Sequence, residues 1–198
     1  MQTLGLSSEA KRSDGRWKSL LWPTVENAWD VDYLGQQGMW ICTLVVAASL
    51  VLTALTGNPL LIGIGVLSAL FYLVGGMGVR QGNWPAAVMV FAVYGLDILA
   101  QAVQFQFPNI FRIAIALVLL SNLRATYLAS EWRPAAEEED LPTRFNETLA
   151  DKFVDQLPPK CWPMLQIPFI ILGVMMLLLT LIGLVVIFAS RFGLIPHR

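Results

Sequence analysis

The sequence predicts an all-α protein, a polytopic integral membrane bundle of five transmembrane helices with a cytoplasmic N-terminus and one amphipathic helix in a cytoplasmic loop. The chain of 198 residues is 56% hydrophobic and 14% charged, with a mean hydropathy of +0.62, whereas soluble domains carry about 25% charged residues. The apolar residues also form long blocks. Only three residues between Trp40 and Leu123 carry a formal charge, and none does from Met164 to Ser190.

The lengths of these blocks and the breaks between them predict the number of spans. A hydrocarbon core of about 30 Å needs about 20 apolar residues, at 1.5 Å per helical residue. Turn-forming residues interrupt the blocks at Gly57-Asn58-Pro59, at Gln81-Gly82-Asn83 and at Pro108-Asn109, because proline and glycine do not continue a helix readily. The predicted spans cover residues 38–56, 60–79, 84–105, 110–128 and 164–188.

The distribution of lysine and arginine predicts the orientation. Cytoplasmic flanks of membrane helices are enriched in these residues. With the N-terminus inside, the cytoplasmic side holds ten of the 13 basic residues, the outer side holds Arg191 and Arg198, and Arg112 lies within a span. A span count of five is needed for this agreement. We therefore predict a multi-pass protein of the cell membrane, meaning the cytoplasmic or inner membrane.

The same reasoning divides the chain into five regions. Residues 1–37 form a cytoplasmic or interfacial N-terminal segment, and residues 38–130 form a four-helix transmembrane core. Residues 131–163 are an acidic cytoplasmic loop, in which residues 131–160 hold eight carboxylates against four cations, a net charge of −4. Residues 164–190 are the fifth transmembrane helix, and residues 191–198 are a short outer tail.

The acidic loop contains a predicted amphipathic helix at residues 143–157. Its apolar half contains Phe145, Leu149, Phe153 and Leu157, which share one face at 100° per residue. The helix could lie on the membrane surface or dock on protein. Helices that bind lipid surfaces favour a polar face rich in Lys and Arg, whereas this polar face has a net charge of −1. Docking on the bundle or on a partner is the favoured interpretation.

Charged and polar residues inside the third and fourth spans form a candidate site, here called the polar seam. Asp97 and Arg112 are the charged members, and such residues in a membrane are costly and commonly functional. Helical spacing places polar neighbours on the same faces. The seam comprises Tyr94, Asp97, Gln101, Gln104, Arg112, Asn122 and Thr126. It could be a buried pair that fixes the packing of two helices, or a polar path or binding site in the outer half of the membrane.

Small residues on one face of the second span predict close helix packing. Lipid offers no hydrophobic reason for helices to associate, so small side chains that allow close approach are favoured at their contacts. The first span carries matching small and polar residues, and the two spans are expected to form a hairpin about the Gly57-Asn58-Pro59 turn. The predicted packing residues are Gly65, Ser68, Ala69, Gly75 and Gly76.

No residue pattern points to catalysis, so we predict that the chain is not an enzyme. His197, the only histidine, lies next to the C-terminus. No Ser, Cys or Lys lies in a recognisable nucleophile motif, and no cluster has the spacing of metal ligands. We predict no catalytic residue, no metal and no cofactor. The net charge of −1 gives no basic surface for nucleic acid.

The leading prediction of function is a non-enzymatic module that works by association in the lipid bilayer. It would be a homo-oligomer or an accessory subunit that binds other membrane protein subunits. The alternative is a small channel or transporter whose path runs along Asp97 and Arg112. Close-packing glycines and a docking helix favour association, whereas the polar seam favours transport.

Overall fold

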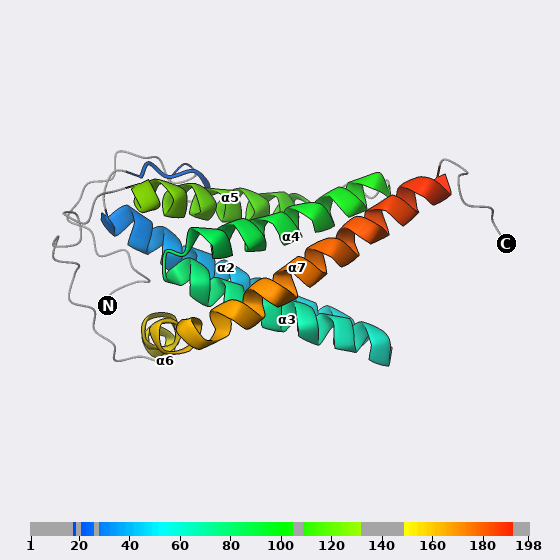
Figure 1. Ribbon diagram of the computed structural model, residues 1–198, viewed down its shortest axis with the longest axis horizontal. Coiled ribbons are helices and arrows are strands. Elements are labelled where there is room, and N and C mark those ends of the chain that lie inside the picture. Colours follow the sequence, from blue (N-terminus) through cyan, green and yellow to red (C-terminus); the bar gives the residue numbers. More distant parts are fainter. Residues whose placement is uncertain (1–17, 19–20, 26–27, 105–108, 132–148, 192–198) are drawn as a thin grey trace.

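The computed structural model describes residues 18, 21–25, 28–104, 109–131 and 149–191, and within these ranges the regular structure is helical. Figure 1 shows its helices. They are α2 (Ala28–Leu55), α3 (Pro59–Arg80), α4 (Trp84–Val103), α5 (Ile110–Glu131), α6 (Leu149–Asp151) and α7 (Leu157–Arg191), with a π-helical turn (Lys152–Gln156) joining α6 to α7. The prediction of an all-helical fold is confirmed, and five of the helices are long and apolar enough to cross a membrane.

The turns between the helices follow from local sequence. Gly57 has φ of 63°, and Asn58 then caps α3 by accepting a hydrogen bond from the backbone N–H of Leu60. The turn before α4 repeats this design with Gly82, whose φ is 66°, and with Asn83 as the cap. Glycine adopts positive φ without steric cost, and a proline within the first turn gives up no helical hydrogen bond. Both turns therefore lie where the sequence predicts.

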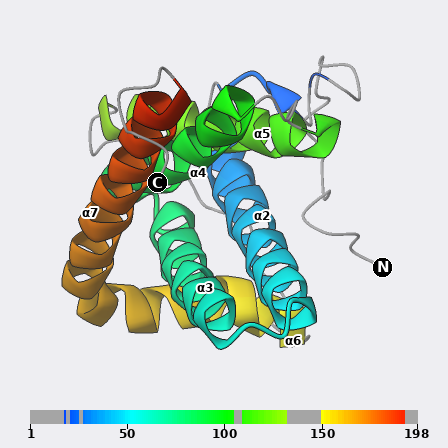
Figure 2. The same cartoon turned by 90° about the vertical axis from the view of Figure 1, so that its right-hand side faces the viewer.

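The five long helices surround one shared core (Figures 1 and 2). The helices α2 and α3 form a hairpin, α4 and α5 form a second antiparallel pair, and α7 crosses α3 and continues along α4. Most of the described buried residues of α3 lie in its second half, from Ala69 to Val79, whereas the hairpin tip around Leu55 and Leu60 is exposed. The core thus lies near the Arg80 end of α3, and the tip diverges from the other helices (Figure 1).

Two helices begin earlier than the predicted spans. The helix α2 starts at Ala28 rather than at residue 38, and the last helix starts at Leu157 rather than at residue 164. Charged residues end a membrane span but they do not end a helix, so α2 includes Asp30 and Asp32. Pro163 and Pro168 lie inside α7, and the helix continues past both.

Two consecutive prolines follow the π turn before α7. Pro158 and Pro159 lack the N–H groups that an α-helix would pair with the carbonyls of Val154 and Asp155. The segment leading into α7 runs crosswise to α2 and α3 rather than parallel to them (Figure 2).

Candidate functional site

The two charged members of the polar seam form an ion pair between α4 and α5. Arg112 Nη1 donates a hydrogen bond to Asp97 Oδ2 at 3.0 Å. Asp97 lies six residues before the end of α4 and Arg112 two residues after the start of α5, so the pair lies about 3–9 Å below the helix ends. The side chains remain 53% and 37% exposed. The pair is therefore on the outside of the bundle, within helices that are long enough to span a membrane.

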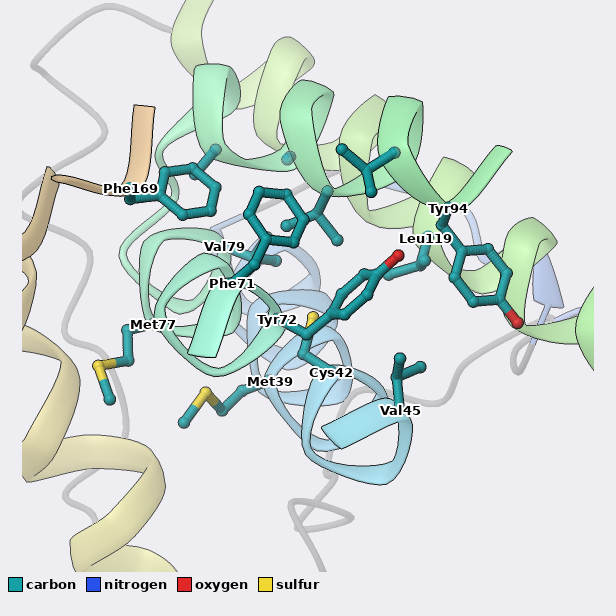
Figure 3. Packing of buried hydrophobic residues seen from close by; sticks show 14 of the residues in the cluster. Met39, Cys42, Val45, Phe71, Tyr72, Met77, Val79, Tyr94, Leu119 and Phe169 are labelled. Atoms are coloured by element: carbon teal, nitrogen blue, oxygen red, sulfur yellow. The ribbon is translucent and has the colours of Figure 1, made fainter. Parts of the chain in front are cut away.

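The remaining seam residues of α4 do not all lie on the same surface as the ion pair. Tyr94 is buried, and its ring meets that of Tyr72 edge-on, with centroids 6.2 Å apart (Figure 3). Gln101 is half-buried, and Gln104 is an exposed residue at the C-terminal cap of α4. Tyr94 thus belongs to the core between α3 and α4, whereas Asp97, Gln101 and Gln104 lie at or near the surface.

The seam residues of α5 lie apart from Arg112. Asn122 and Thr126 are buried and bond to their own helix, Asn122 Nδ2 to the carbonyl of Val118 at 2.8 Å and Thr126 Oγ1 to the carbonyl of Asn122 at 3.0 Å. A Cβ at Gly38 of α2 would lie 2.9 Å from Asn122 Oδ1. The structure therefore brings Asp97 and Arg112 together, but Asn122 lies against Gly38 of α2 and Thr126 is bonded to its own helix.

The predicted packing face of α3 contacts three helices. A Cβ at Gly65 would overlap Thr53, and one at Gly76 would lie 2.8 Å from Cys42 Cβ, so both glycines lie close against α2. Gly75 instead faces Val90 of α4 and Phe169 of α7. Ala69 is buried and Ser68 half-buried. Figure 3 shows Met39 and Cys42 beside Phe71 and Tyr72 in this core.

A buried charge cluster at the other end of the bundle was missed by the sequence analysis. Arg80 Nη1 contacts Asp32 of α2 at 2.7 Å, and Nη2 contacts Asp155 of the π turn at 2.6 Å. The Arg80 side chain is 10% exposed. These three residues, here called the Arg80 triad, join α2, α3 and the start of the last helix. No local pattern signals the triad, because 48 and 75 residues separate its members.

The predicted docking helix is partly within the described residues. Phe145 and the rest of residues 143–148 lie outside them. Phe153 and Leu157 pack against the core, and Phe153 lies 6.1 Å from the ring of Trp40. Val154 is completely buried, whereas Leu149 is 85% exposed. The apolar half is thus in contact with the bundle from Phe153 onward.

No protein-family model, curated protein or solved structure matches this chain significantly. Within the ranges that the structure describes, no group of His, Cys, Asp or Glu could hold a metal ion. The two charge clusters and the surfaces around them are the features of the described residues that bear on function.

Proposed function

We propose that this chain is a non-enzymatic membrane module that works by association, as a homo-oligomer or as an accessory subunit of a membrane complex. The observation that carries the proposal is the exposed Asp97–Arg112 pair. A charge at the centre of a bilayer costs about 2.5–3.5 kcal/mol on insertion scales, an upper limit for a pair this close to the helix ends, and charged residues in spans normally face a protein interior or a water-filled cavity. A pair on the outer surface of a bundle is best accommodated when another chain covers it.

The hydrogen-bonding capacity of the pair supports this proposal. A guanidinium group has five N–H donors and a carboxylate accepts several hydrogen bonds. Among the described residues, Arg112 makes one side-chain hydrogen bond, to Asp97. The remaining donors and lone pairs suit polar groups of a neighbouring chain. The half-buried Gln101 and the exposed Gln104 extend this polar surface toward the end of α4.

Transport along the seam is the second candidate, favoured by the same run of polar residues on α4. The positions of Tyr94, Asn122 and Thr126 favour association over a path through a single chain. Tyr94 lies in the core, and Asn122 and Thr126 bond to their own helix backbone. The residues that would extend a path from Arg112 along α5 therefore lie apart from the ion pair.

Neutralising the pair separates the two candidates. Asp97→Asn, Arg112→Gln and the double variant should each weaken assembly on the order of tenfold, because interhelical polar contacts in membranes contribute up to about 1–2 kcal/mol. Mass in mild detergent across a dilution series measures this effect. Gln81→Ala, an exposed polar residue at the other end of the bundle, is the matched control and should assemble like the wild type.

Transport predicts a different result for the same variants. The double variant would keep its assembled mass but lose ion or solute flux in liposomes. If all three variants keep the wild-type mass at every dilution, association through this surface is wrong.

The proposed topology places the Arg80 end of the bundle in the cytoplasm. The support is the excess of basic residues on that side of the chain. Reporter fusions at Gly82, Arg133 and Pro159 are expected to report cytoplasmic positions, and fusions at Asn58, Asn109 and His197 exported ones. A cytoplasmic reporter at His197 would require an even number of spans and would contradict the proposed orientation.

A further inference from the structure

A basic hollow lies where the last helical run begins. It has a volume of about 170 Å³ and is lined by Lys152, Gln156, Leu157 and Lys160. Both lysines are exposed, whereas Gln156 and Leu157 are half-buried. The helical run that contains the candidate span begins at Lys152, and its uncharged part extends from Met164 to Ser190. If α7 crosses the bilayer, the hollow lies just before this uncharged part, on the side of the lipid headgroups.

The π turn aligns the polar groups of the hollow. In an α-helix, residues four apart advance by about 40° around the axis, so Lys152 and Lys160 would lie about 80° apart. A π turn takes more residues per turn, because its hydrogen bonds join residues five apart. Four residues of the π turn therefore make less than one full turn, so Gln156 lies slightly behind Lys152 around the helix axis. Four α-helical residues make slightly more than one full turn, so Lys160 lies slightly ahead of Gln156. The two ammonium groups and the amide thus share one face.

The carboxylate that lies between the two lysines in sequence does not face them. Asp155 binds Arg80 at 2.6 Å, on the side of the turn that packs against the bundle. The Asp155 side chain is 12% exposed. The ion pair of Asp155 is therefore with Arg80 rather than with Lys152 or Lys160.

An exposed apolar stripe continues from the hollow along α7. Met164, Ile167 and Ile171 follow Lys160 at four, seven and eleven residues, the spacing of one helix face. They are 80%, 70% and 65% exposed. One face of the helix therefore presents two cations and an amide, and then three bare aliphatic side chains. An amphiphile with an anionic head and an alkyl tail has the complementary form.

We infer that this face binds an anionic phospholipid, with the headgroup phosphate held by Lys152, Gln156 and Lys160 and the acyl chain along Met164, Ile167 and Ile171. The inference does not depend on association through Asp97 and Arg112. Basic residues at the cytoplasmic membrane surface attract anionic lipids, and the aliphatic stripe selects a lipid over a soluble phosphate. The bilayer would then supply a specific lipid ligand in addition to the apolar surroundings of the helices.

The test compares two lipids with identical acyl chains on the purified full chain in mild detergent. Phosphatidylglycerol should bind more tightly than phosphatidylcholine, measured by native mass spectrometry. Lys152→Gln with Lys160→Gln should weaken phosphatidylglycerol binding about fivefold per lysine, or about 25-fold together. Phosphatidylcholine binding should change less than about twofold by the same reasoning. Lys18→Gln removes an exposed cation elsewhere and should leave both affinities unchanged.

Two further measurements test the site even if the glutamine variants fail to fold. In the wild type, phosphatidylglycerol should protect Lys152 and Lys160, but not Lys18, from amine acylation. Arginine at both positions should retain lipid binding. Equal binding of the two lipids, an unchanged affinity in the glutamine variant or absence of protection would overturn the site. Equal protection by millimolar inorganic phosphate would show a site for a free anion rather than a lipid.

Discussion

Replacing Arg80 with glutamine is expected to lower the melting temperature by roughly 6–20 °C, the largest effect of any single change considered. Arg80 is 10% exposed and holds Asp32 and Asp155 at 2.7 and 2.6 Å. Removing one partner of a buried ion pair costs about 3–5 kcal/mol, because an uncompensated charge remains. Each kcal/mol corresponds to about 2–4 °C for a chain of this length. Thermal unfolding in mild detergent, followed by circular dichroism, measures the change.

Two companion variants identify the cause of this loss. Adding Asp155→Asn to Arg80→Gln should recover part of the stability, because one of the two carboxylates that lose the Arg80 contact is neutralised. Lys160→Gln removes an exposed cation near the same end of the bundle and should change stability by less than about 0.5 kcal/mol. If Arg80→Gln and Lys160→Gln melt at the same temperature, the triad does not join these helices.

Replacing Gly78 with leucine is the second change with a large expected effect. A Cβ at Gly78 would lie 2.5 Å from the Trp162 ring and 2.6 Å from the Cβ of Ala86. Trp162 is buried and packs edge-on against Phe169, so its ring cannot move aside without displacing Phe169. Forcing extra atoms into a packed core costs about 1–3 kcal/mol and occasionally more. The helices α3, α4 and α7 would have to separate.

Gly63 offers a matched control on the same helix. A Cβ at Gly63 would meet no atom within 4 Å, so leucine there extends outward without a clash. Leucine also favours the helix over glycine by about 0.8–1.0 kcal/mol or slightly less. Gly63→Leu should therefore unfold at or above the wild-type temperature, whereas Gly78→Leu unfolds well below it. Equal melting temperatures for the two variants would show that α3 does not approach α7 and α4 closely at Gly78.

The number of helices and their turns could be predicted from sequence because the signals are local. Apolar blocks of about 20 residues fix the helices, and Gly57-Asn58-Pro59 carries its own turn chemistry. The starts of α2 and α7 could not be predicted in this way, since apolar length reports the extent of a span rather than of a helix. In α2 the additional helical turns hold Asp32, which contacts Arg80 across 48 residues of sequence.

The polar seam shows a different limit of sequence reasoning. Helical periodicity predicts that Arg112, Asn122 and Thr126 share one face of α5, but it does not say which helix lies opposite each of them. The pairing of Asp97 with Arg112 could be predicted, because a short connection brings these helix ends together. Farther along, α5 packs on α2 at Gly38, so Asn122 meets a different neighbour. The Arg80 triad required the three-dimensional arrangement of three helices.

The mass of the wild-type chain in lipid nanodiscs tests association most directly. Extraction in mild detergent, transfer to nanodiscs and light scattering give the polypeptide mass, and mass spectrometry identifies any protein that remains bound. One chain has a mass of 21.9 kDa. Association predicts at least two chains per particle, or one chain with a membrane protein in fixed stoichiometry. A particle that holds a single 21.9-kDa chain and no other protein, at every protein-to-lipid ratio, would contradict it.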